Sequence, residues 1–479
     1  MRYQLVRAAL LTPCLLTFMP TLQAAQPPDV VASDSSGNTA MGTAALARFS
    51  GGSYNTAAGY GTLSALTSAS QNSALGSGAL NALAQGNFNT AIGYNALLVT
   101  TGSTGNTAVG ALSLTANETA SFNTALGYAA SAGNTIGTQN TALGGHAMSQ
   151  NAQGNANTVV GDQAMQGGSS ASNNTVVGNE ALGSNTGADN TALGRSAMGA
   201  NGSGINNTAE GYAALFSNTT GHQNQAIGVM ALYSNTTGNN SVAVGANALH
   251  SNTTGYDCDA VGSGSMMGNV SGYECAALGA NTLPQSATGA KNYAVGSGAG
   301  SAITGIRNID IGTPGVAGDN SAVRIGGSSQ TATYIAGIYG TPVSGSALFV
   351  SPTGQLGVVP SSKRFKTGVA SLGAASEGLA ALRPVSFELK GDADHKRQFG
   401  LIAEQVARVY PDLVIRDEHG RIDGVRYDEL APLLVDQYQK DHQRLLDQAS
   451  AIAENNAELT ALMKQASGLA LEMAMKAGK

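Results

Sequence analysis

The sequence has no tryptophan, and only 5% of its 479 residues are aromatic and only 11% charged. Small side chains therefore dominate, which excludes the thick core of large residues that an ordinary globular enzyme builds over such a length. The net charge is -6, and the long middle region has no basic stripe that could neutralise phosphates. We therefore exclude nucleic acid as a partner.

The N-terminus is typical of a secretory signal peptide over residues 1–24. Arg2 and Arg7 give a basic start, an apolar stretch follows over residues 8–19, and Leu-Gln-Ala then ends in a small residue suitable for cleavage. The stretch is shorter than the roughly 20 residues that span a bilayer, and no later run is long and apolar enough, so we expect no integral membrane segment after signal removal. Cys14 follows Thr-Pro instead of lipobox residues, which disfavours a lipid anchor. We expect an exported protein, extracellular, on the cell surface or periplasmic.

Charge is spread unevenly along the chain. Residues 25–360 contain 5 Lys or Arg and 12 Asp or Glu, which is 17 charges in 336 residues. Residues 361–479 contain 16 Lys or Arg and 17 Asp or Glu, which is 33 charges in 119 residues. Such a change marks a domain boundary, because the two parts must solve solvation and packing differently. We place the boundary at residue 360.

One phrase returns throughout the first part, as in Asn-Thr-Ala-Ile-Gly at residues 89–93. A small residue and then usually Leu or Met follow three and four positions after the glycine, as in Ala147-Met148. The repeat spans residues 38–312, and its glycines lie 17 residues apart except at two steps of 16. They are Gly42, Gly59, Gly76, Gly93, Gly110, Gly127, Gly144, Gly161, Gly178, Gly194, Gly211, Gly228, Gly245, Gly262, Gly279, Gly296 and Gly312.

A period this short cannot hold two helices, so each repeat is predicted to be one coil of a parallel β-solenoid. Because strand residues alternate between faces, Ala and Asn should share one face, and Thr and the aliphatic residue the other. Gly and Asn-Thr-Thr-Gly segments, such as residues 218–221, should supply the turns. With ladders about 4.8 Å apart, the coils give a rod of roughly 80 Å.

The phrase Asn-Ser-Val-Ala-Val-Gly at residues 240–245 resembles the head repeat of trimeric autotransporter adhesins. The resemblance covers residues 38–312 and implies a left-handed parallel β-roll assembled as a homotrimer, although those heads commonly use a shorter repeat. No segment resembles the membrane-anchoring strands of that family. The near-identical repeats single out no site for a surface ligand, so surface adhesion stays an open alternative.

Two other patterns accompany the repeat. Many Asn-x-Thr and Asn-x-Ser triplets occur in the coils, and the strict period favours turn and ladder residues over glycan acceptors. Residues 313–360 lose the period and place Gly and Pro between short apolar runs, which predicts a β-rich connector.

Five motifs follow the boundary in order, and together they closely resemble the peptidase S74 domain. This is the C-terminal intramolecular chaperone of phage endosialidases and tail fibres, also found in the membrane-bound myelin regulatory factor. The resemblance covers residues 361–445 and implies a small α+β domain that trimerises, guides assembly of the β-rich fibre before it, and then cuts itself away. The motifs lie at residues 361–366, 379–387, 399–406, 410–414 and 425–430.

The resemblance places the family's catalytic dyad at Ser361, the nucleophile, and Lys366, the base, with cleavage between Pro360 and Ser361. A Ser hydroxyl becomes a good nucleophile when a neighbouring base takes its proton, and a Lys can do so only when it is neutral. Positive charge on Lys363 and Arg364 and desolvation on closure of a trimer both favour a neutral lysine. Such coupling would delay cleavage until assembly is complete.

Two alternatives to this assignment remain open. Ser362 stands where the family usually has Asp, and it could be the nucleophile in place of Ser361. Lys366 could also be a solvated surface lysine beside a linker serine. The protein would then be a purely structural or adhesive surface protein whose C-terminal domain trimerises without cleaving.

Beyond Tyr427 a seven-residue repeat predicts a parallel trimeric coiled coil over residues 433–475. Asn456 in the seam favours one register and oligomeric state at some cost in stability. No second His or Cys lies at ligand spacing from His442, so we predict no metal site, and nothing in the sequence calls for a cofactor. The two core positions hold Tyr438, Leu445, Ile452 and Leu459, and Val435, His442, Ala449, Asn456 and Met463.

Cys258 and Cys275 are the two cysteines that remain after signal removal. Both lie four residues before a repeat glycine, so the solenoid predicts them in adjacent coils on one face, with Cα atoms about 4.8 Å apart. Disulfides accept roughly 4.4 to 6.8 Å, and an exported chain meets an oxidising compartment. In-register neighbours hold their Cβ atoms farther apart than a relaxed bridge prefers. A disulfide and a reduced stacked pair therefore both remain open.

Overall fold

The computed structural model describes residues 31–336, 346–351, 353–390, 392–417 and 419–477. The chain divides into two compact units, residues 1–335 and 336–479, which are described separately. The predicted signal peptide, with Cys14, lies outside the described residues.

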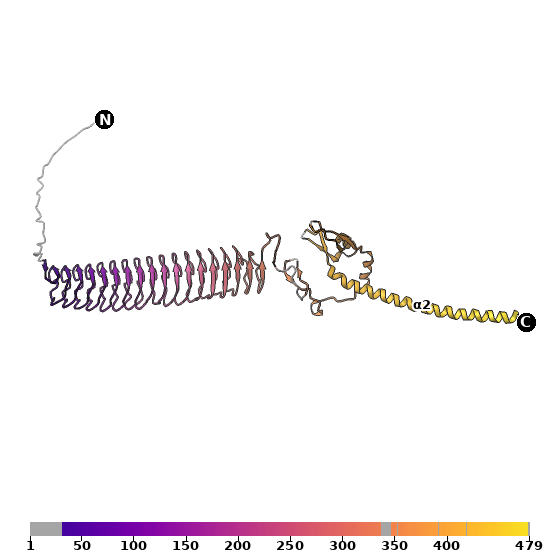
Figure 1. The fold of residues 1–479 in the computed structure, drawn as a ribbon, viewed down its shortest axis with the longest axis horizontal. Helices are drawn as coiled ribbons and strands as arrows, with labels where there is room; N and C mark the ends of the chain where they lie inside the picture. The colour runs from indigo at the N-terminus through magenta and orange to yellow at the C-terminus, as the bar shows by residue number, and fades with distance from the viewer. Residues whose placement is uncertain (1–30, 337–345, 352, 391, 418, 478–479) are drawn as a thin grey trace, which may run out of the picture. The chain divides into compact units, whose positions relative to one another are not determined.

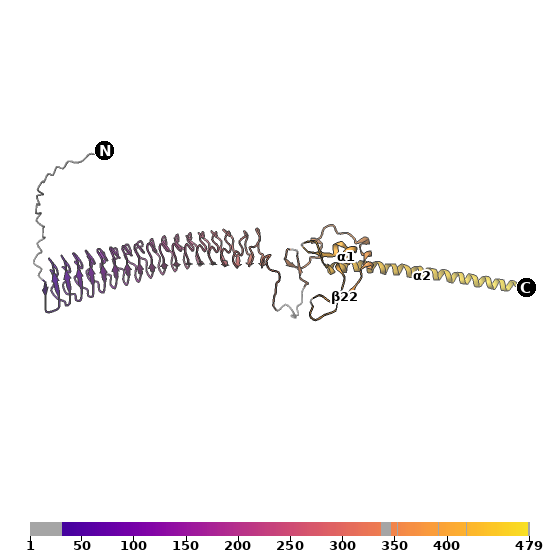
Figure 2. The ribbon, with the colours of Figure 1, turned by 90° about the horizontal axis from the view of Figure 1, so that it is seen from above.

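The first unit is a parallel β-solenoid, as the 17-residue period predicts. Each coil contributes one short strand that pairs in parallel with the next, and Figures 1 and 2 show these strands side by side in chain order. β1 (Ala32–Ser33) pairs antiparallel with the first of them. The others are β2 (Thr39–Met41), β3 (Thr56–Ala58), β4 (Ser73–Leu75), β5 (Thr90–Ile92), β6 (Thr107–Val109), β7 (Thr124–Leu126), β8 (Thr141–Leu143), β9 (Thr158–Val160), β10 (Thr175–Val177), β11 (Thr191–Leu193), β12 (Thr208–Glu210), β13 (Gln225–Ile227), β14 (Val242–Val244), β15 (Cys258–Val261), β16 (Cys275–Leu278), β17 (Tyr293–Val295), β18 (Ile309–Ile311) and β19 (Val323–Ile325).

The strand faces divide as predicted, with Ala inward and Thr and the aliphatic residue outward. In β7 the pattern is exposed, buried, exposed for Thr124, Ala125 and Leu126. The small residue and the Leu or Met after the glycine, such as Ala147 and Met148, are also fully buried. The core is therefore a set of narrow ladders, which small residues can fill.

Two asparagine ladders also run through the interior. In the first, Asn89 donates its backbone N–H and its Nδ2 to Asn72 Oδ1 in the preceding coil, both at 3.0 Å. In the second, Asn235 Nδ2 donates to Asn218 Oδ1 at 2.9 Å. These asparagines are fully buried, as is Asn252 in another Asn-Thr-Thr-Gly segment. The burial supports the ladder interpretation of the Asn-x-Thr triplets. Bonding between coils satisfies the buried amides of these five asparagines.

The turns differ from the expectation that glycine and Asn-Thr-Thr-Gly segments supply them. Bulky residues also take the left-handed conformation, as do Asn95 and Leu97 with φ of 54° and 52°. Such a φ is uncommon for leucine. Two contacts stabilise the left-handed conformation of Leu97. Its side chain is fully buried, and its N–H donates to the Ser113 carbonyl in the next coil at 3.0 Å.

The roll extends past its predicted end at residue 312. β19 pairs with β18, so residues 313–325, predicted as connector, belong to the sheet. Asp310 and Arg324 occupy the inward rungs where earlier coils have alanine, and Arg324 binds Asp319 at 2.6 and 2.9 Å. Burial raises the pKa of Asp310. Charged rungs end the apolar core, as terminal capping repeats do in solenoids.

The second unit is a small α+β body that continues into one long helix. Its core contains Val406, Leu413, Val414, Leu430 and Leu433. None of the helices in the described residues is long and apolar enough to cross a bilayer. In chain order the elements are β20 (Phe349–Val350), β21 (Leu356–Gly357), η1 (Lys363–Phe365), η2 (Gly373–Ala381), β22 (Val385–Phe387), β23 (Gln398–Gly400), α1 (Ala403–Val409), η3 (Pro411–Leu413), β24 (Val414–Arg416), β25 (Ile422–Val425) and α2 (Tyr427–Ala477).

We predict that Gly144→Ala destabilises the roll. Gly144 has φ of 136°, and an added Cβ would lie 2.3 Å from the Gly161 carbonyl oxygen in the next coil. Backbone strain of this kind costs about 1–3 kcal/mol before the clash is counted, so the free energy of unfolding should fall by at least that much. The control is Gly102→Ala, whose Cβ would meet nothing closer than 3.8 Å. Equal melting temperatures of the two variants by circular dichroism would contradict the prediction.

Candidate functional site

Ser361 and Lys366 lie side by side in the second unit. Lys366 Nζ is 3.5 Å from Ser361 Oγ, a long hydrogen bond, and both residues are exposed. The turn η1 between them is closed by the Lys366 N–H, which donates to the Lys363 carbonyl at 3.1 Å. One tight turn thus brings together two side chains that are five residues apart.

Ser362 has a different place in the same turn. Its carbonyl accepts the Phe365 N–H at 3.0 Å, and its side chain makes no capping bond. Among the described residues, the Lys366 ammonium is hydrogen-bonded to Ser361 and not to Ser362. The geometry therefore favours Ser361 of the two candidate nucleophiles.

The surroundings of the dyad are open within one chain. Arg364, expected to supply positive charge, stacks on Phe365 with its Cζ 4.6 Å from the ring centroid. Phe365 is 60% exposed, and Val358 and Val359 just before the dyad are also exposed. A Ser-Lys dyad requires exclusion of water around the lysine, and the described residues of this unit do not provide it in a single chain.

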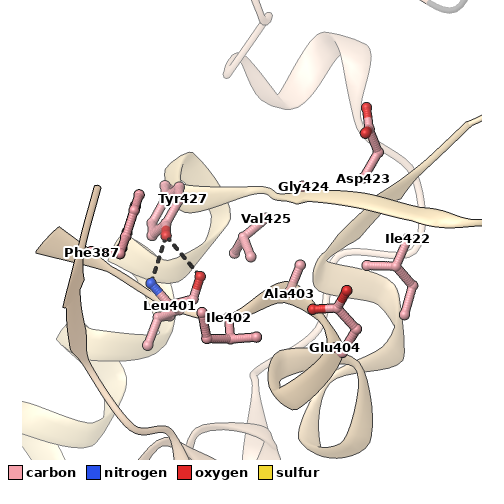
Figure 3. Close-up of a pocket in the computed structure, with 10 residues that line it drawn as sticks. All are labelled: Phe387, Leu401, Ile402, Ala403, Glu404, Ile422, Asp423, Gly424, Val425 and Tyr427. Atoms are coloured by element: carbon pink, nitrogen blue, oxygen red, sulfur yellow. Dashed lines mark hydrogen bonds between the residues drawn. The ribbon is translucent and has the colours of Figure 1, made fainter. Parts of the chain in front are cut away.

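A pocket of about 290 Å³ lies in the body of this unit (Figure 3). The Tyr427 hydroxyl accepts the Leu401 N–H at 2.8 Å and donates to the Leu401 carbonyl at 3.5 Å. This pair of bonds joins the start of α2 to the segment after β23. The two segments belong to the predicted motifs at residues 425–430 and 399–406. The lining is mostly aliphatic with two carboxylates, Glu404 and Asp423, and it contains neither member of the dyad.

A second Ser-Lys contact was missed by sequence reasoning. Ser376 in η2 is fully buried; its Oγ donates to Asp436 Oδ2 at 2.5 Å and accepts from Lys440 Nζ at 2.8 Å. Lys440 also pairs with Asp436 at 2.8 Å and donates to the Gly373 carbonyl. Lys440 and then Ser376 hold the pKa of the Asp436 carboxyl below its usual range.

Ser376 is therefore a positioning residue and not a second nucleophile. Its hydroxyl is bonded on both sides, and no part of it is open to a substrate. It fixes η2 against α2. The only signal in the sequence was the i,i+4 spacing of Asp436 and Lys440 on a predicted helix, which does not identify the distant serine.

The predicted coiled-coil positions lie on α2, which covers the expected residues 433–475. Tyr438, Leu445, Ile452 and Leu459 are all exposed in the single chain. An exposed apolar stripe along a long helix is the surface that a coiled coil buries.

The roll carries a second uncovered apolar surface, which we call the outer ladder. It consists of the outward strand residue one position before each repeat glycine, together with Ile325. Many of its members, such as Leu75 and Leu278, are half exposed. An apolar row of this length on a flat sheet marks an interaction surface. The members are Met41, Ala58, Leu75, Ile92, Val109, Leu126, Leu143, Val160, Val177, Leu193, Glu210, Ile227, Val244, Val261, Leu278, Val295, Ile311 and Ile325.

Cys258 and Cys275 are register partners in adjacent coils, as predicted, and both are buried. They replace two asparagines of the first ladder. Their thiols donate to the carbonyls of Gly272 and Gly289 at 3.2 and 3.3 Å. The hydrogen bond to Cys275 and burial raise the pKa of the Cys258 thiol. The structure holds both as free thiols, which is the reduced stacked pair of the two alternatives.

Comparison with known families bears on the second unit. Residues 361–415 match the peptidase S74 family. The family model is described as the chaperone of endosialidase. This S74 segment begins at Ser361 and includes Lys366, Ser376 and α1, but it covers neither the roll nor α2. No curated protein and no solved structure matches the chain. A β-solenoid followed by an S74 segment fits a trimeric fibre-like protein with a chaperone domain.

We predict that Asp436→Asn destabilises the second unit at neutral pH but not in acid. The folded pKa of Asp436 is depressed below the ordinary value of about 3.9. The carboxylate therefore stabilises the fold above the unfolded pKa, and this contribution is lost as pH falls through the folded pKa. The variant should melt below the parent at pH 7. The difference should shrink as pH falls below about 4 and vanish below the folded pKa.

The control for this measurement is Glu454→Gln, an exposed acid further along α2. It should melt like the parent at every pH. A deficit for Asp436→Asn that stays constant from pH 7 to pH 3 would show that the carboxylate charge is not what stabilises the contact.

Proposed function

We propose that the protein is an exported homotrimeric fibre whose C-terminal domain acts as an intramolecular chaperone and then cuts the chain between Pro360 and Ser361. The observation that carries this proposal is the 3.5 Å approach of Lys366 Nζ to Ser361 Oγ at the first residue of the S74 segment. The S74 resemblance implies these two roles for residues at these positions.

The proposed reaction uses the two side chains and one water. Neutral Lys366 takes the Ser361 hydroxyl proton as Oγ attacks the carbonyl carbon of Pro360. The Pro360–Ser361 C–N bond breaks as the proton passes to the nitrogen, leaving an ester between Pro360 and Ser361 Oγ. Water hydrolyses the ester to a Pro360 carboxylate and a free Ser361 hydroxyl. No cofactor takes part.

Trimer formation would supply what the dyad lacks in one chain. The outer ladder and the α2 stripe are apolar surfaces that a second and third copy would cover. Exposed Phe365, next to the base, would be buried in the same event. Excluding water there favours the neutral lysine, so cutting would follow assembly.

A C-terminal chaperone domain would also help the roll to fold in the correct register. Its coils are nearly identical, so strands pairing one coil out of place would meet almost the same side chains. A C-terminal domain that brings three chains together at one end gives all the rolls a common starting point. Once the rolls are assembled, that domain is no longer needed and cleavage can release it.

The rival function is a purely structural or adhesive surface protein whose C-terminal domain trimerises without cleaving. The solvent exposure of Ser361 and Lys366 favours this alternative. A denaturing gel of the purified protein separates the two. Fragments that divide near residue 360 support self-cleavage, and an intact chain supports the rival.

We predict that Ser361→Ala and Lys366→Ala each leave the chain intact on such a gel while still forming trimers, because the dyad acts on one bond and α2 holds the oligomer. Loss of either group should slow cleavage by at least about a thousandfold. Lys390→Ala, which removes an exposed lysine elsewhere in the second unit, is the matched control and should cleave like the parent. If Ser361→Ala or Lys366→Ala cleaves normally, the dyad is wrong. If Ser362→Ala alone abolishes cutting, the nucleophile is Ser362.

A further inference from the structure

One rung of the outer ladder is charged. Seventeen of its 18 members are apolar, and the exception is Glu210 in β12, whose side chain is exposed on the same face. Its register partners are Leu193 in β11 and Ile227 in β13. A lone carboxylate in an apolar row is unfavourable once the row is covered, unless a partner charge meets it.

The preceding coil carries the opposite charge. Arg195 follows Leu193 by two residues, just past the repeat glycine, and is exposed. It is the only Lys or Arg between Arg48 and Lys291. Its guanidinium lies 6.0 Å from the centroid of the Tyr212 ring in the coil of Glu210.

Neither charge has an ion-pair partner among the described residues of its own chain. The ion pairs in the described part of the roll are Lys291 with Glu274 and Arg324 with Asp319. Arg195 and Glu210 are thus an unpaired cation and an unpaired anion in adjacent coils, both next to the apolar row. The surface is complementary in charge to a second copy of itself.

We propose that Glu210 of one chain forms an ion pair with Arg195 of a second copy, and that these pairs set the axial register of the assembled rolls. The inference rests on the proposed trimer. One coil, about 4.8 Å, separates the two residues along the roll, a span that an arginine side chain bridges. Arginine is suited to the role because it stays charged when buried and binds a carboxylate with two hydrogen bonds.

The pair would specify a register that the apolar rungs cannot. When one roll slides past another by a coil, Val, Leu and Ile still meet Val, Leu and Ile. In a closed ring of three chains, the same slip brings one Glu210–Arg195 pair level but moves another to two coils apart, roughly 9.6 Å, and leaves that carboxylate covered without a partner. Fixing register is the best-attested use of a buried polar or ionic group in an apolar seam.

The test uses the full chain with single charge reversals, Arg195→Glu and Glu210→Arg, and their double reversal. The matched control is Glu118→Arg, the same change of charge on an exposed residue outside the ladder. The readout is the half-life of the trimer in hot SDS. Each single reversal should shorten it at least about tenfold relative to the control, and the double reversal should restore it. Additive losses in the double reversal would overturn the pairing.

A second experiment shows whether the pair joins two chains or lies within one. Chains with Arg195→Glu and chains with Glu210→Arg, carrying tags of different mass, are co-expressed, and the trimers are counted by native mass spectrometry. Pairing between chains predicts mixed trimers well above the statistical share. A statistical distribution would contradict it.

The parent protein separates failure of this inference from failure of the proposed function. A parent with the mass of a monomer would refute the trimer, and the pairing with it. A trimeric parent whose single reversals behave like Glu118→Arg would refute the pairing alone.

Discussion

In-register stacking of each coil on the next is the constraint on which the structure depends. A strand of three residues is too short to be stable alone, so each coil is held by bonds to its neighbours. The Asn89–Asn72 contact shows how one amide serves both coils. The close approach of Gly144 to the Gly161 carbonyl shows that the spacing leaves no room for a side chain there. Stability in such a solenoid is a sum of neighbour contacts, so it grows with repetition.

The same repetition does not determine how several copies of the chain assemble. A single roll bonds its buried amides from coil to coil, with the Asn134 Oδ1 atom as an exception, but it keeps an apolar ladder on its surface, and α2 keeps an apolar stripe. In the proposed trimer, copies of the chain would cover both surfaces. The S74 segment, with its exposed dyad, lies in the same unit as α2, so an event that joins three helices can also change the surroundings of Ser361 and Lys366. On the proposed function, assembly and cleavage are in this way linked through one small domain.

Sequence reasoning predicted the features set by the period: the 17-residue coil, inward Ala and Asn, outward Thr, and the stacked cysteines. Ser361 and Lys366 lie within 3.5 Å of each other, and their roles as a dyad stay a prediction. Sequence reasoning missed features set by packing. Left-handed Leu97 depends on burial and on a bond to the next coil, which overrides the local preference of leucine. Ser376 meets Lys440 across 64 residues, and no periodic signal links positions so far apart. β19 lies after a shorter step that breaks the period, so the end of the roll was placed too early.

The central claim is that assembly completes the dyad. The most direct measurement is a refolding time course at several protein concentrations, with trimer followed by native mass spectrometry and cleavage by denaturing gel on the same samples. The account predicts that cleavage lags behind trimer formation and slows with dilution in step with it. A chain that stays monomeric because Leu445 and Ile452 are replaced by Asp should remain intact. Cleavage of that monomer at the parent rate would contradict the account.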